Sequence, residues 1–151
     1  DVIWIDPREG AFPSAVPFNV ATIQSGNPAA EIADAPPGSF ALVMTHSHAL
    51  DLEIIDAVLR SPSFAYAGLI GSATKRARFS KRLREAGVAE NRIEELVCPI
   101  GIPSIKSKHP SAIAAATAVQ LLERDEVMRC AESPLAESFR LDKVGAGRRA
   151  S

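Results

Sequence analysis

The sequence contains only two cysteines among its 151 residues, Cys98 and Cys130, and they are far apart. A disulfide framework needs several cysteines and a zinc knuckle needs closely spaced pairs, so neither is expected. The sequence also lacks an apolar run that approaches the roughly 20 residues of a membrane span, and its first residues do not resemble a signal peptide. We therefore expect a protein without a membrane span in a reducing compartment, with the cytoplasm as the default location.

An excess of positive charge is absent as well. The chain has 17 Lys and Arg residues against 18 Asp and Glu residues, which gives a formal net charge of -1. There is no chain-wide basic field to attract a nucleic acid, and any basic site must be local. With 46% hydrophobic residues, the composition is that of one globular domain, which we place at residues 1–130, followed by a flexible tail at residues 131–151.

Apolar runs alternate with helical patterns along the chain. Runs rich in β-branched residues and bounded by turn residues favour strands, whereas apolar residues three and four positions apart favour helices. The predicted strands are residues 2–5, 19–23, 40–45, 64–70 and 96–100, and the predicted helices are residues 48–60, 74–87 and 111–128. This order predicts an α/β domain with a doubly wound, mostly parallel, Rossmann-like sheet.

A Gly-rich turn ahead of the first predicted strand is missing. A dinucleotide-binding fold of the usual order begins with a central strand and a Gly-rich turn, and reaches an acidic residue such as Asp6 only afterwards. We therefore expect a Rossmann-like sheet without its first strand and that turn. Either the chain is a fragment of a longer protein, or a partner chain fills the gap. Exchange of elements between protomers is one way to complete such a sheet, so we also expect a homodimer.

Asp6 ends the first predicted strand, where a ribose-binding carboxylate would lie, and Arg8 is placed to meet a 2′-phosphate or another anion. An ordinary turn, Asp-Pro followed by a solvated arginine, accounts for the same residues. Both interpretations stay open.

Two of the three histidines, His46 and His48, stand between a predicted strand and a predicted helix, with Asp51 one helical turn further on. They could be metal ligands, acid–base groups or hydrogen-bond donors to a heterocycle. A metal site needs three or four converging ligands, and only a remote histidine remains, so we do not expect a metal. Alternatively, Ser47 or His48 caps the helix and Asp51 lies near its positive end.

The strongest anion site in the sequence follows the fourth predicted strand. Gly68 and Gly71 let a ligand approach the backbone, and Ser72 can cap the next helix. Lys75 and Arg76 then place positive charge where the helix dipole does not favour it, as functional sites often do. The alternative is a solvated basic face that continues through Arg78, Lys81, Arg82 and Arg84.

Cys98 and Gly101 end the last predicted strand, at the same edge as the other candidates. The predicted cofactor-binding residues are therefore twelve: Asp6, Arg8, His46, His48, Asp51, Gly68, Gly71, Ser72, Lys75, Arg76, Cys98 and Gly101. A cysteine in a strand more often acts as a small buried hydrophobe. A thiol that carries sulfur or binds a metal would need a lowered pKa.

Four motifs occur in the order Asp6-Pro7-Arg8, Thr45-His46-Ser47-His48-Ala49-Leu50-Asp51, Gly68-Leu69-Ile70-Gly71-Ser72 and Cys98-Pro99-Ile100-Gly101. Together they resemble the C-terminal domain of the XdhC/CoxI family, over residues 1–126. Members of this family are accessory proteins for xanthine dehydrogenase and related molybdenum hydroxylases. Four ordered motifs are much more specific than any one of them.

The resemblance implies a chaperone without turnover of its own, which binds molybdenum cofactor (molybdopterin), supports its sulfuration and passes it to the molybdenum hydroxylase. A cysteine desulfurase is then an expected further partner. The phosphate of the cofactor would lie near Gly71, Ser72, Lys75 and Arg76, and the histidines would face its pterin or dithiolene end. Two alternatives are an NAD(P)-binding oxidoreductase, for which Asp6 and the fold argue, and an interaction module that packs through its Ala-rich last helix.

Overall fold

The computed structural model describes residues 1–132, and the chain divides into two compact units, Asp1–Pro99 and Ile100–Ser151. The tail that we expect at residues 131–151 lies outside the described residues from position 133 onward. Among the described residues, no helix is both long and apolar enough to cross a membrane.

The first unit contains five parallel strands. They are β1 (Val2–Asp6), β2 (Val20–Gln24), β3 (Ser39–Val43), β4 (Phe64–Leu69) and β5 (Leu96–Val97). Three strands are shorter than predicted, and β4 lacks only the last predicted residue, Ile70. β3 ends at Val43 because the amide of Thr45 donates to the side chain of Asp51, and β5 stops at Val97, shortly before Pro99, which has no N–H for a ladder.

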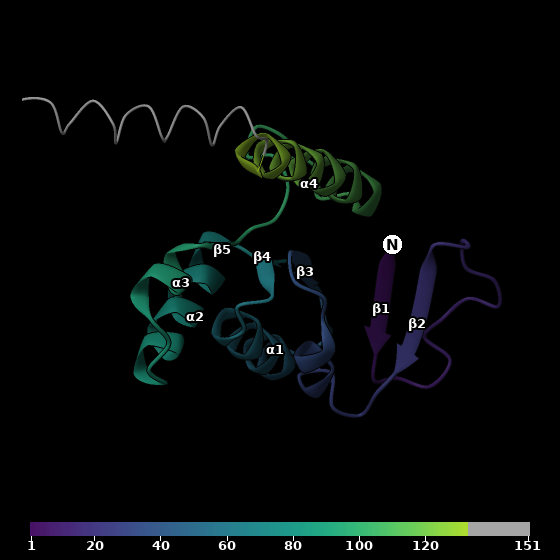
Figure 1. Cartoon of the computed structure of the whole chain (residues 1–151), viewed down its shortest axis with the longest axis horizontal. Helices are drawn as coiled ribbons and strands as arrows, with labels where there is room; N and C mark the ends of the chain where they lie inside the picture. The colour runs from purple at the N-terminus through teal and green to yellow at the C-terminus, as the bar shows by residue number, and fades with distance from the viewer. Residues whose placement is uncertain (133–151) are drawn as a thin grey trace, which may run out of the picture. The chain divides into compact units, whose positions relative to one another are not determined.

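These strands form two small sheets, β1-β2 and β3-β4-β5. Among the described residues, β1 pairs only with β2 and β3 pairs only with β4, which leaves one edge of each strand unpaired (Figure 1). A doubly wound sheet would carry one further strand between these edges. The prediction of an α/β domain with parallel, Rossmann-like strand pairing is confirmed.

Two long helices follow the strands of the larger sheet. α1 (His48–Arg60) has the predicted bounds, and α2 (Ala73–Glu85) ends two residues before Gly87, whose positive φ of 78° is typical of a glycine after a helix. A 3₁₀ helix, η1 (Ala30–Asp34), and the short α3 (Glu90–Glu94) were not predicted. Each has only five residues, too few to show a helical period.

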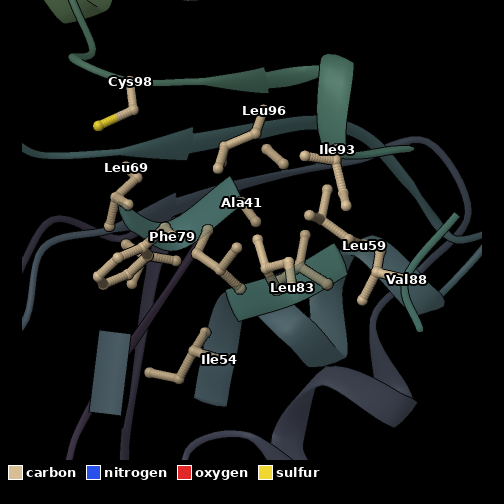
Figure 2. Packing of buried hydrophobic residues seen from close by; sticks show 14 of the residues in the cluster. Ala41, Ile54, Leu59, Leu69, Phe79, Leu83, Val88, Ile93, Leu96 and Cys98 are labelled. Carbon is tan, nitrogen blue, oxygen red and sulfur yellow. The ribbon is translucent and has the colours of Figure 1, made fainter. Parts of the chain in front are cut away.

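The core lies between the larger sheet and these helices. Figure 2 shows side chains from α1 and α2, among them Leu59, Phe79 and Leu83, packed against the sheet. In β3 the buried residues alternate, Ala41 and Val43, so one face of the strand meets the helices. Burial of each large apolar side chain contributes about 1.5–3 kcal/mol. This packing holds the first turns of α1 and α2 beside the carboxyl ends of β3 and β4.

The second unit contains α4 (Pro110–Glu132), which begins at the proline that opens the predicted helix. Its Gln120 side chain forms two hydrogen bonds of 2.9 Å with Gly101, accepting from the amide and donating to the carbonyl. Gly101 has a φ of 93°, and a Cβ there would lie 3.3 Å from Cβ of Ala116. Gly101 therefore anchors its loop to α4.

Candidate functional site

The loop between β3 and α1 presents both histidines to solvent. Ser47 caps α1 by accepting a hydrogen bond from the amide of Leu50 at 3.4 Å, and Thr45 Oγ1 donates to the carbonyl of Ser47 at 2.9 Å. Because these polar groups bond within the loop, the turn is fixed, whereas His46 and His48 stay exposed. The capping role expected for Ser47 is confirmed.

The loop between β4 and α2 has a similar design. Ser72 caps α2 by accepting from the amide of Lys75 at 3.2 Å. A Cβ on Gly71 would lie 2.6 Å from Cδ of Lys75 and 3.2 Å from Sγ of Cys98, so a side chain at this position would displace its neighbours. Glycine at position 71 lets the loop close tightly over two buried side chains.

A buried ion pair joins the two loops. Nζ of Lys75 lies 2.6 Å from Oδ2 of Asp51, and the exposed fractions of the two side chains are 10% and 0%. The other carboxylate oxygen of Asp51 accepts from the amide of Thr45 at 2.9 Å, and Lys75 also donates to the carbonyl of Ile70 at 2.9 Å. Asp51 is thus bonded to the β3–α1 loop and Lys75 to the β4–α2 loop, so the ion pair between them fixes the position of one loop relative to the other.

Residues of the two loops and of the adjoining helix starts line an open hollow of about 400 Å³ beside this pair. Its volume is within the usual range of small-molecule sites. The loop of β3 and α1 contributes three lining residues and the loop and first turns of β4 and α2 contribute six. They are Thr45, His46, His48, Ile70, Gly71, Ser72, Thr74, Lys75 and Arg78. None of them is acidic, so the hollow favours an anionic or hydrogen-bonding ligand.

Arg76 does not face this hollow. Its guanidinium donates to the carbonyl of Leu96 at 2.7 Å and to that of Glu94 at 3.3 Å. It lines a second hollow of about 380 Å³ between α2 and α3. Arg76 thus ties α2 to β5 and α3, a structural task that the sequence did not reveal.

Cys98 lines the second hollow and packs beneath Gly71. Burial raises the pKa of its thiol above the ordinary value, although the positive charges of Lys75 and Arg76 act in the opposite direction. Its Sγ lies 3.7 Å from the carbonyl of Ser72, to which it donates. A raised pKa keeps the thiol protonated, which does not favour a reactive sulfur carrier in this conformation.

Asp6 and Arg8 bind each other at the end of β1. Arg8 donates from Nε and a terminal nitrogen to the two carboxylate oxygens, at 2.9 and 2.8 Å, and from its backbone amide at 3.0 Å. These hydrogen bonds lower the pKa of Asp6 to about 2, and the charge of nearby His46 adds a smaller effect. The pair has the geometry of the ordinary turn, and both carboxylate oxygens already have a partner.

The structure thus brings five of the twelve predicted site residues into one hollow: His46, His48, Gly71, Ser72 and Lys75. The others have different positions: Asp51 is buried beneath it, Gly68 is inside β4, Gly101 is in the second unit, and Asp6, Arg8, Arg76 and Cys98 are not among its lining residues.

Four lining residues were not among the predicted site residues: Thr45, Ile70, Thr74 and Arg78. The spacing of Thr74 and Arg78, four residues apart on a helix, is the signal that could have placed them on one face. Arg78 instead looked like part of a solvated basic face.

Metal binding has no geometric support in the described part of the chain. No group of three or more His, Cys, Asp or Glu side chains there is placed to hold a metal ion.

Parallel strands that alternate with helices define a Rossmann-like α/β domain. The chain belongs to the family of the XdhC Rossmann domain, whose model matches residues 1–121. It is similar to the uncharacterized protein YqeB of Escherichia coli (strain K12), with 32% identity over 118 residues. The match covers 77% of this chain and 21% of YqeB, so the chain spans about a fifth of the length of that relative.

Proposed function

We propose that this domain holds molybdenum cofactor in an accessory protein of the XdhC family, which supports sulfuration of the cofactor and inserts it into xanthine dehydrogenase or a related molybdenum hydroxylase. The observation that carries the proposal is the hollow between the β3–α1 and β4–α2 loops. It combines basic and hydrogen-bonding side chains with no acidic residue, in a chain that belongs to this family.

The lining residues fit such a cofactor chemically. Molybdopterin carries a phosphate and a pterin with several hydrogen-bonding edges. Ser72, Thr74 and Arg78 would hold the anionic end, and His46 and His48 would hydrogen-bond the heterocycle or its sulfur-bearing side. The bound cofactor supplies the redox chemistry of the acceptor enzyme, whereas this domain binds, orients and shields it.

An NAD(P)-binding oxidoreductase is the alternative that the fold leaves open. Its main support was Asp6 as a ribose ligand, but both carboxylate oxygens of Asp6 accept hydrogen bonds from Arg8. The geometry therefore supports the cofactor-holding function better.

The test is purification of the chain from cells that make molybdenum cofactor, followed by measurement of molybdenum, pterin and NAD(P) in the same sample. We expect pterin and molybdenum in a fixed ratio and no nucleotide. A His46→Asn, His48→Asn double variant should retain much less pterin. His109→Asn is the matched control, because His109 does not line the hollow.

Retention of nucleotide without pterin would contradict this function and favour the oxidoreductase. A folded chain that retains neither, and binds neither in calorimetry, would instead favour an interaction module.

A further inference from the structure

The start of α2 carries three cations with different surroundings. Lys75 is buried against Asp51 and the carbonyl of Ile70, and its ammonium lies 5.4 Å from the ring centre of Phe79. Arg76 donates to the carbonyls of Leu96 and Glu94. The donors of both residues already have partners within the fold.

Arg78 differs from both. It is exposed and lines the hollow, and it makes no hydrogen bond or ion pair with any other residue in the described part of the chain. It lies one helical turn after Thr74, which lines the same hollow. Since the charge of Lys75 is neutralised by Asp51, Arg78 supplies the unneutralised positive charge on the α2 side.

The chemistry of this wall matches a phosphate monoester. A guanidinium offers a planar fork of donors that suits phosphate oxygens, and a positive charge strengthens each hydrogen bond. Ser72 and Thr74, which both carry a hydroxyl group, also line the hollow, and the opposite loop supplies His46 and His48. No carboxylate among the lining residues would repel a dianion.

We infer that Arg78 is the anion-recognising residue of this hollow, and that it binds the phosphate monoester of a larger ligand. The inference deepens the proposed function, on which the identity of that larger ligand rests. In this assignment Lys75 positions the two loops from beneath and Arg76 anchors β5, so neither binds the phosphate.

The experiment titrates the chain with inorganic phosphate at constant ionic strength and follows it by calorimetry and backbone amide NMR. We expect shifts for amides of residues 72–78. Arg78→Gln should weaken phosphate binding by roughly tenfold or more, because a charge-assisted hydrogen bond is lost. Arg82→Gln removes the same charge one turn further along α2, outside the lining residues, and should change the affinity by less than about twofold.

If both variants weakened phosphate binding equally, the inference would be overturned. Such a result would show that phosphate responds to the total positive charge of α2 and not to Arg78 in particular. Absence of phosphate binding to the wild-type chain would overturn it as well.

Retention of pterin in the same variants separates this inference from the proposed function. Wild-type chain that binds phosphate through Arg78 but retains no pterin would support the inference and contradict the function. Pterin retention that is unchanged in Arg78→Gln would support the function and overturn the assignment of Arg78.

Discussion

At the scale of single residues, the Asp51–Lys75 pair organises the site. Buried charges are costly, and a pair persists where each partner has further hydrogen bonds. Asp51 accepts a hydrogen bond from the amide of Thr45, just after β3, and Lys75 donates one to the carbonyl of Ile70, just after β4. The pair therefore connects the starts of the two helices with the ends of the two strands. The loops that carry the histidines and Ser72 are thereby held in one arrangement.

Replacement of Lys75 by methionine should destabilise the protein strongly. It leaves the carboxylate of Asp51 buried without its cation, and breaking a buried pair in this way costs about 3–5 kcal/mol. Urea unfolding followed by circular dichroism measures the loss. Lys81→Met is the matched control, because Lys81 and Glu85 are exposed and 3.9 Å apart, and it should cost less than about 1 kcal/mol.

The double variant Asp51→Leu, Lys75→Met should regain part of the stability, since no charge is then buried. Equal losses for Lys75→Met and Lys81→Met would show that the buried pair has no special role.

The pKa of Asp6 gives a prediction on pH dependence. In the folded chain this pKa is lowered to about 2 from the ordinary value of 3.8. The ion pair with Arg8 therefore makes its full contribution to stability at pH values above 3.8. This contribution is lost as the pH falls from 3.8 through about 2. Carboxyl carbon NMR should show that Arg8→Gln moves the Asp6 titration back toward 3.8; an unchanged titration would contradict the pairing.

At the scale of secondary-structure elements, Arg76 connects α2 with β5 and α3. Arg76→Met keeps the helix but frees the carbonyls of Leu96 and Glu94, at a cost of about 1.5–3 kcal/mol. We expect faster hydrogen exchange at β5 and α3 and a smaller loss of phosphate affinity than for Arg78→Gln. Unchanged exchange with a large loss of affinity would assign Arg76 to the anion site instead, and Arg82→Met serves as the control.

At the scale of the whole molecule, β1 and β3 each have one edge that pairs with no other strand of residues 1–132. Val2 and Ile3 of β1 are about half exposed, at 51% and 53%, which is unusual for apolar residues of a strand. Such edges readily pair with another strand, so the homodimer predicted from the sequence stays a prediction that this surface supports.

Light scattering over a range of protein concentrations tests whether the chain forms a homodimer. We expect mass to rise toward a dimer with concentration, and Ile3→Lys to reduce the association, because a charged side chain on an edge strand opposes pairing. A stable monomer at every concentration would contradict the homodimer.

Much of the fold could be predicted because the determinants are local. The period of apolar residues gave α1 its bounds, Ser47 and Ser72 marked helix starts, and the strand–helix alternation predicted a parallel sheet. The end of β3 could not be predicted, since it depends on a side chain eight residues beyond the strand.

The sequence by itself determined the class of domain and the two loops that line the hollow, because caps, glycines and histidines at strand ends are local signals. Only the tertiary structure decided which cation does what. Lys75, Arg76 and Arg78 are equivalent in a list of charges. The partners of Lys75 and Arg76 come from positions 5 to 24 residues away, and Arg78 has no partner among the described residues. A charge acts through what lies next to it in space, and the packing of α2 against the sheet sets those neighbours.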